Sequence, residues 1–188
     1  MKLVLLFFAA FFCIHAEAQQ ILPLTKLNVS TSVVLPIYNN KPFSEYKTST
    51  GLQIQLGANL YKGEVLLTAT TFTNKNPALT EYQSLLFTLG YLLNIPIRKN
   101  VWLKPYAGFG ANYMMFEHNK YNTKNLRESE LIYQLGLAFQ IKLHKKLHLQ
   151  AGSFYTSTQT FYKQHQLFLQ SGLLYYFNTP KAIQYLIN

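Results

Sequence analysis

Apolar residues recur at every second position in eight successive segments between Leu27 and Phe177. This period of two is typical of β-strands that have one apolar and one polar face. In the clearest segment, residues 52–60, Leu, Ile and Ala side chains alternate with Gln, Gly and Asn. The other segments are residues 27–37, 65–69, 85–95, 103–113, 131–141, 147–151 and 167–177. The chain is therefore predicted to be all-β, with eight antiparallel strands.

The connections between these segments alternate in length. Short turns are predicted at residues 62–63, 98–100 and 144–146, and longer polar loops at 39–50, 74–80, 117–127 and 157–162. An up-and-down barrel has this pattern when both termini lie at the end with the short turns. Outer-membrane barrels combine short periplasmic turns with longer extracellular loops. The alternation therefore predicts a transmembrane β-barrel with periplasmic termini.

The first 18 residues have the features of a cleaved secretory signal peptide. Lys2 precedes an apolar run over residues 3–14, and Ala16-Glu17-Ala18 forms a small-residue cleavage site. The run is too short for a membrane-spanning helix, which needs about 20 apolar residues. We therefore expect a signal peptide at 1–18, a barrel at 19–177 and a short periplasmic tail at 178–188.

The missing residue types exclude several classes of site. Cys13 is the only cysteine and lies within the predicted leader, and the chain contains no Asp. Disulfide scaffolds, zinc–cysteine sites and mechanisms that need an aspartate are thereby excluded. We expect no cofactor and no metal.

The polar faces of the predicted strands decide which face lies outside. They consist of Gln, Asn, Ser, Thr and Gly, with almost no charge at mid-strand. Strands that face water normally carry Lys and Glu, so these faces fit a packed lumen better than a soluble surface. Inward glycines leave room there for Gln and Tyr side chains: Gly57, Gly90, Gly108, Gly110, Gly136, Gly152 and Gly172. A secreted, soluble lipocalin-like carrier, with the two faces reversed, is the alternative.

Aromatic residues gather near the ends of the strands, which predicts two girdles at lipid–water interfaces. The girdle near the long loops comprises Tyr38, Phe72, Tyr82, Tyr113, Phe116, Tyr133 and Tyr155. The girdle near the short turns comprises Trp102, Tyr175 and Phe177.

Two segments resemble a known family. Residues 104–111 read Lys-Pro-Tyr-Ala-Gly-Phe-Gly-Ala, and residues 170–177 read Gln-Ser-Gly-Leu-Leu-Tyr-Tyr-Phe. Over residues 24–177 the chain is similar to the small outer-membrane β-barrels of the OmpX and OmpA-transmembrane type. The resemblance implies that Gln170, Gly172, Tyr175 and Phe177 form the signal read by the barrel assembly machinery. Many family members end on the final Phe, whereas this chain continues to Asn188. Such a resemblance transfers location well and activity poorly.

Charged residues in the inward phase collect near the short turns: Lys26, Glu64, Lys104, Lys142 and His148. They form either a basic periplasmic mouth that attracts anions or a solvated plug in which Glu64 pairs with one lysine. We favour the plug, because accessible ion pairs contribute little. An eight-stranded barrel fills its interior with side chains, so we expect no conducting pore. The formal charge of +10 is spread over both ends, so nucleic acid is not an expected partner.

The long loops carry Lys41, Lys47, Lys75, Lys120, Lys124 and Arg127. These cations are candidates for contacts with lipopolysaccharide phosphates or another polyanion, and a merely solvated loop surface is the alternative. Loop residues that could support a lipid A hydrolase or acyltransferase are His118, His165, Glu117, Glu128, Glu130, Ser129 and Ser157. No spacing fixes a nucleophile, base and acid among them. We therefore predict a non-enzymatic, monomeric outer-membrane barrel with a structural, adhesive or lipopolysaccharide-contacting role, and keep the lipid A enzyme and the soluble carrier as alternatives.

Overall fold

The computed structural model describes residues 26–40, 43–76, 81–116, 127–160 and 163–180, and nearly all of them lie in β-strands. The predicted signal peptide and most of the predicted tail lie outside these residues. Eight long strands are present: β1 (Lys26–Asn39), β3 (Gly51–Leu60), β4 (Gly63–Lys75), β5 (Tyr82–Leu93), β7 (Val101–Phe116), β8 (Arg127–Lys142), β9 (Leu147–Thr158) and β10 (Gln164–Asn178). Two short strands accompany them, β2 (Lys47–Thr48) and β6 (Ile95–Arg98).

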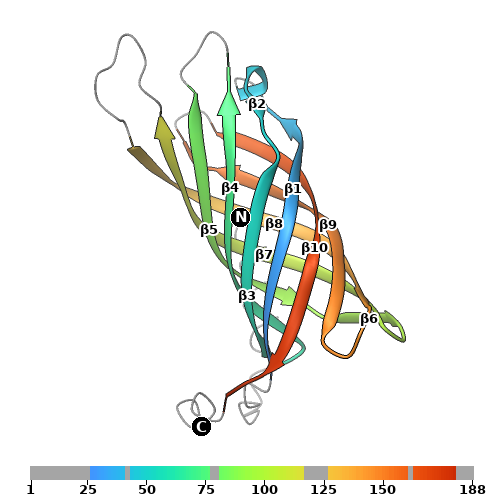
Figure 1. Ribbon diagram of the computed structural model, residues 1–188. Helices are drawn as coiled ribbons and strands as arrows, with labels where there is room; N and C mark the ends of the chain where they lie inside the picture. The colour runs from blue at the N-terminus through green and yellow to red at the C-terminus, as the bar shows by residue number, and fades with distance from the viewer. Residues whose placement is uncertain (1–25, 41–42, 77–80, 117–126, 161–162, 181–188) are drawn as a thin grey trace, which may run out of the picture.

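The eight long strands form a closed antiparallel barrel (Figure 1). Each pairs with its neighbours in the chain, and β1 pairs with β10 to close the sheet. All described long connections lie at one end of the barrel, the long-loop end, and the turns β3–β4, β6–β7 and β8–β9 lie at the other, the short-turn end. The predicted eight-stranded up-and-down barrel is confirmed.

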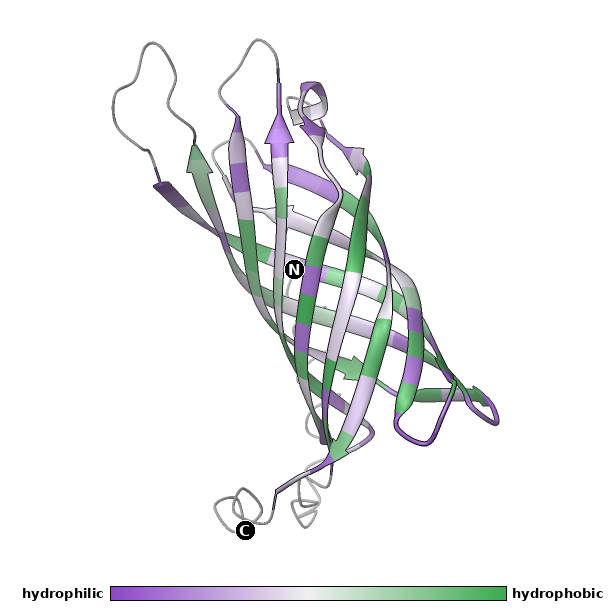
Figure 2. Cartoon of the chain, viewed as in Figure 1, coloured by the Kyte–Doolittle hydropathy of each residue, from purple (hydrophilic) through white to green (hydrophobic). Residues whose placement is uncertain are grey.

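The predicted faces are also confirmed. Leu135 is 61% exposed on the outside, whereas the adjacent Gln134 is only 2% exposed in the lumen. Leu52, Ile54 and Leu56 lie outside in the same way, and this alternation appears as green and purple bands along the strands (Figure 2). Because apolar side chains cover the outside and amides fill the inside, the face arrangement of a soluble lipocalin-like carrier is contradicted.

The connections differ from prediction in detail. The first turn is formed by Tyr61 and Lys62, and Tyr61 has a φ of 54°, so Gly63 begins β4 and is not a turn residue. In the second turn Asn100 has a φ of 72°, a conformation that Asn tolerates better than most residues. The first long loop contains β2, which pairs with the end of β4, and a 3₁₀ turn, η1 (Phe43–Glu45). No helix in the described ranges is long and apolar enough to cross a membrane.

The aromatic girdles are only partly as predicted. Tyr38, Tyr113, Tyr133, Tyr155 and Tyr175 lie exposed on the outer surface. Four of the predicted girdle residues face inward instead, because they occupy the polar phase of their strands: Phe72, Tyr82, Trp102 and Phe116. Phe177 is half-buried at the end of β10.

The lumen contains an apolar layer that the sequence analysis did not predict. Near the long-loop end, six strands each contribute one inward apolar residue: Val34, Phe72, Leu86, Ile132, Phe154 and Phe168. All are at most 4% exposed, and the Phe154 and Phe168 rings stack with centroids 5.0 Å apart. The expectation of a lumen filled only by amides and glycines is therefore wrong at this level.

Below the apolar layer, amides and hydroxyls fill the middle of the barrel together with the buried Leu66, Leu92 and Ala138. Gln134 Nε2 donates to Thr156 Oγ1 (3.2 Å), and its Oε1 accepts from Thr88 Oγ1 (3.2 Å). Gln53 donates to Thr70 in a similar cross-strand pair (3.1 Å). The cavity left among these side chains is about 20 Å³, room for about one water. The apolar layer and this network together close the lumen along its axis.

Candidate functional site

A buried ion pair lies inside the barrel at the short-turn end. Lys104 Nζ on β7 donates to Glu64 Oε1 on β4 at 2.7 Å, and each side chain is only 2% exposed. Tyr176 on β10 donates its hydroxyl to the same carboxylate oxygen (2.7 Å), and Asn28 on β1 donates to Oε2 (2.8 Å). Three donors thus hold the carboxylate, and a buried charge needs such hydrogen-bonded partners. Glu64 pairs with one lysine, as we expected. The pair is enclosed by other side chains, whereas we expected it to be solvated.

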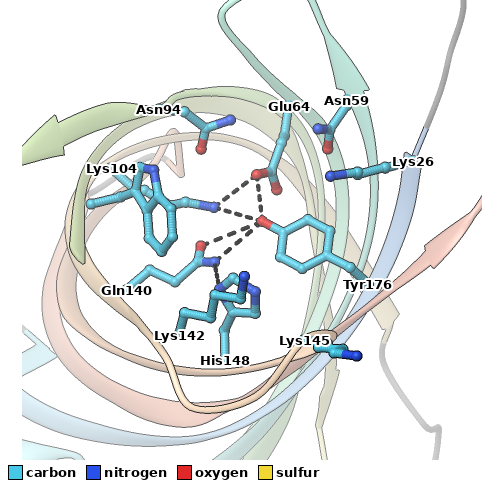
Figure 3. Close-up of a pocket in the computed structure, with 11 residues that line it drawn as sticks. Lys26, Asn59, Glu64, Asn94, Lys104, Gln140, Lys142, Lys145, His148 and Tyr176 are labelled. Atoms are coloured by element: carbon cyan, nitrogen blue, oxygen red, sulfur yellow. Dashed lines mark hydrogen bonds and ion pairs between the residues drawn. The ribbon is translucent and has the colours of Figure 1, made fainter. Parts of the chain in front are cut away.

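Further side chains extend this cluster across the lumen (Figure 3). Lys104 also donates to the Tyr176 hydroxyl (3.0 Å), and Gln140 Nε2 donates to the same oxygen (3.3 Å). Gln140 also lies within hydrogen-bond reach of His148 Nδ1. The Trp102 ring packs against the His148 ring with centroids 5.6 Å apart.

The sequence analysis missed Asn28, Trp102, Gln140 and Tyr176 as members of this cluster. All four occupy inward-facing positions close to a short turn, so the sequence alone indicates which face each lies on and how far along the barrel axis. Their meeting depends on which residues face each other across the closed barrel, and alternation carries no information on that.

A cavity of about 280 Å³, here called the vestibule, opens beside this cluster. It is lined by Lys26, Asn59, Glu64, Asn94, Trp102, Lys104, Gln140, Lys142, Lys145, His148 and Tyr176. The structure therefore brings all five predicted mouth residues together around one space. Lys26, Lys142 and Lys145 are exposed at its rim, and no described side chain forms an ion pair or hydrogen bond with their amino groups.

Charge is distributed unequally between the two ends. In the described ranges the cations of the short-turn end are Lys26, Lys62, Arg98, Lys99, Lys104, Lys142, Lys145 and Lys146, against one acid, Glu64. At the long-loop end, Lys47, Lys75, Arg127 and Lys163 face an equal number of acids, Glu45, Glu81, Glu128 and Glu130. Within the described residues the positive charge is therefore concentrated at the short-turn end and not spread evenly.

Three of the six predicted lipopolysaccharide-contacting cations lie at the long-loop end, and the other three, Lys41, Lys120 and Lys124, lie outside the described residues. Lys47 and Lys75 are register partners in β2 and β4, and Lys75 forms an exposed ion pair with Glu81 (3.5 Å). Arg127 begins β8. Near them the Tyr46 ring packs edge-on against Tyr82 (5.2 Å), and burial together with the Glu45 carboxylate raises the pKa of the Tyr46 hydroxyl.

The catalytic candidates that fall within the described ranges do not form a triad. His165 pairs in register with Ser157, but its Nδ1 lies 2.7 Å from the Tyr155 hydroxyl. Ser157 Oγ accepts from Gln159 Nε2 (2.9 Å). No carboxylate in the described chain contacts His165; Ser129, Glu128 and Glu130 lie on β8, and Glu117 and His118 lie outside the described residues. No group of three His, Cys or Glu side chains able to hold a metal ion occurs in the described part either.

The predicted assembly signal lies in β10, the strand that closes the barrel. Gln170 faces the lumen, Gly172 pairs with Ser32 of β1, and Tyr175 is 44% exposed on the outer surface. A Cβ atom at position 172 would overlap the Ser32 side chain and the Thr31 carbonyl oxygen. Only glycine therefore allows this close contact between the first and last strands.

Comparison with known proteins agrees with this geometry at the level of fold. No protein-family model and no curated protein sequence matches the chain. Among solved structures, Neisserial surface protein A is 10% identical with a TM-score of 0.65, over 80% of this chain and 95% of that one. A major outer membrane protein from Thermus thermophilus is 15% identical with a TM-score of 0.57, over 81% and 99%. The chain has the fold of the small outer-membrane β-barrels.

A third similar structure is Ail, the attachment invasion locus protein of Yersinia pestis, solved in complex with the heparin analogue sucrose octasulfate. It is 15% identical, with a TM-score of 0.50 over 81% of this chain and 95% of Ail. The resemblance noted from residues 104–111 and 170–177 is thus confirmed for the architecture. At these identities the similarity describes the fold, and the role of the chain has to be argued from its own residues.

Proposed function

We propose that this chain is an integral outer-membrane β-barrel protein whose outer face contacts lipid directly. The observation that carries the proposal is the closed barrel with an apolar outside, on which Leu52 is 60% and Leu135 is 61% exposed. Exposed apolar area of this extent is costly in water, whereas in a bilayer it matches the acyl chains. The backbone hydrogen bonds of the eight long strands close on one another around the barrel, as a membrane-spanning sheet requires.

The test is a substitution at the middle of β8. Leu135→Arg places a charge near the centre of the apolar belt, which costs about 2–4 kcal/mol in a barrel midplane. We expect reduced assembly, measured as the folded fraction in purified outer membranes. Leu135→Phe is the matched control, because it changes shape without adding charge. Equal assembly of the two variants would contradict a lipid-facing position for Leu135.

The proposed role is structural or adhesive, with lipopolysaccharide contact through the long loops, and not conduction. The closed lumen argues against a pore, and loop cations attract phosphate groups. The polysulfated ligand of Ail gives a precedent for anion binding by a barrel of this fold. If the loops bind lipopolysaccharide, Lys47→Gln with Arg127→Gln weakens binding of labelled lipopolysaccharide, whereas Lys62→Gln with Lys99→Gln at the other end leaves it unchanged. Equal loss in both double variants would contradict loop contact.

We propose no enzymatic activity. Tyr155 and not a carboxylate occupies the Nδ1 side of His165, so the described residues offer no general base oriented by an acid. Lipid A from a deletion strain is expected to have an unchanged mass spectrum. A missing or added acyl chain that is restored by the wild-type chain but not by His165→Ala would establish the lipid A-modifying alternative.

The proposed orientation places both termini and the short turns in the periplasm, after export by residues 1–18 and assembly through the signal at Gln170, Gly172, Tyr175 and Phe177. Cys13 is the only cysteine, and in this proposal it leaves with the cleaved leader, so single cysteines can be added without background. Lys47→Cys is expected to react with a membrane-impermeant maleimide in intact cells, and Lys99→Cys only after lysis. The reverse pattern would contradict the orientation.

A further inference from the structure

The vestibule has the composition of an anion-binding site. Of its four lysines only Lys104 is neutralised, by Glu64, so Lys26, Lys142 and Lys145 remain as unpaired cations around one cavity. A concave site lined by one sign of charge focuses the electrostatic field and concentrates counter-ions. The surrounding turns add Lys62, Arg98, Lys99 and Lys146, which extend the positive potential beyond the rim.

We infer that the vestibule binds a small, multiply charged oxyanion of the phosphate class. The Lys26 amino group is directed toward the cavity (Figure 3). Charge-assisted hydrogen bonds from lysines to phosphate oxygens are among the stronger polar contacts. The amide groups of Asn59 and Asn94 also line the space, and their Nδ2 groups can donate to an anion, whereas their Oδ1 atoms only accept. The amide Nδ2 donors thus add to the lysine ammonium groups that face an anion in this space.

The size and position of the cavity restrict the ligand further. A volume of about 280 Å³ lies at the lower limit of ligand pockets, which favours a small solute over a large one. The Glu64–Lys104 pair, held by Asn28 and Tyr176, forms a rigid inner wall. A bound anion therefore remains at the mouth and does not pass through the barrel.

The chain carries its own reporter for this site. Trp102 is the only tryptophan, and it lines the vestibule. Its fluorescence in the full-length folded protein, in neutral detergent micelles, should change saturably on titration with inorganic pyrophosphate. Lys26→Gln with Lys142→Gln removes two vestibule cations and should weaken this binding at least about tenfold, by loss of two charge interactions.

The matched control removes the same number of positive charges from the short-turn end, at residues outside the vestibule. Lys99→Gln with Lys146→Gln alters turn residues that do not line the vestibule, and pyrophosphate affinity should stay within about twofold of wild type. If the first double variant does not fold, the adjacent pair Lys145→Gln and Lys146→Gln gives the same contrast, because only Lys145 lines the cavity.

Three results would overturn the inference. The first is the absence of a saturable Trp102 response to pyrophosphate. The second is an equal loss of affinity in the vestibule and control variants, which would reduce the effect to diffuse attraction by the charged end. The third is a change in Trp102 fluorescence that occurs in nanodiscs only when phosphatidylglycerol replaces phosphatidylcholine. The ligand would then be a lipid headgroup and not a soluble anion.

Discussion

The buried ion pair makes a quantitative prediction about stability. Glu64→Gln preserves the shape of the side chain but leaves the Lys104 ammonium, 2% exposed, without a counter-charge. Removal of one partner from a buried pair typically destabilises a protein by about 3–5 kcal/mol. We expect a loss of this size in the free energy of unfolding, measured by urea titration of the barrel refolded in phospholipid vesicles. The matched control is Glu81→Gln in the exposed Lys75–Glu81 pair, which should cost less than about 1 kcal/mol.

A double variant separates the charge from the packing. If the isolated ammonium causes the loss of stability in Glu64→Gln, adding Lys104→Met restores most of the lost free energy of unfolding, because no unpaired charge then remains at this pair. The coupling energy from the two single variants and the double variant measures this directly. A loss below about 1 kcal/mol in Glu64→Gln, or strict additivity of the two substitutions, would refute the argument that the pair is buried and coupled.

Two further predictions concern the packing of the lumen, and both are read from the same urea titration. Phe168→Ala opens a cavity in the apolar layer and should lower the free energy of unfolding by about 3–5 kcal/mol. Leu169→Ala, on the lipid side, should lower it less. A larger loss for Leu169→Ala than for Phe168→Ala would contradict the position of the apolar layer inside the barrel. Gly110→Ala should prevent folding, because its methyl group would overlap the Phe87 carbonyl oxygen. Gly136→Ala, whose methyl group meets its neighbours at 3.0 Å or more, should fold, and equal folding of both glycine variants would show that the β5–β7 contact is looser than described.

The architecture of this barrel could be predicted because the information that specifies it is periodic. Each strand alternates between lipid and lumen, so a side chain's face follows from its position alone, as for Leu135 and Gln134. The alternating lengths of the connections then predict an up-and-down topology. Both signals are local, so they need no knowledge of which residues meet across the lumen.

Some aromatic residues were predicted wrongly to lie in the outer girdles, because their height along the strand was given more weight than the face of the strand that they occupy. Phe72 and Tyr82 lie near the long loops, and their height suggested an interfacial girdle. Both share the phase of lumen residues such as Thr70 and Ser84, and both are buried. Phase was therefore the better guide, and consistent use of it would have revealed part of the apolar layer.

The candidate site could be predicted only as a set of charges at one end. Glu64 and Lys104 are separated by 40 residues and come from β4 and β7, which are not neighbours in the sheet. Whether they meet depends on the tilt and stagger of the closed barrel. For the same reason, nothing in the sequence indicated that Tyr176 and Asn28 complete the shell around the carboxylate.

The most direct test of the central claim is electrophoretic mobility in SDS before and after heating. A closed membrane barrel resists SDS until it is heated, so we expect the chain in the detergent-extracted outer-membrane fraction, with a band that shifts on boiling. A chain recovered in the soluble periplasmic fraction, with the same mobility before and after boiling, would contradict the claim that the apolar face of the barrel lies in lipid.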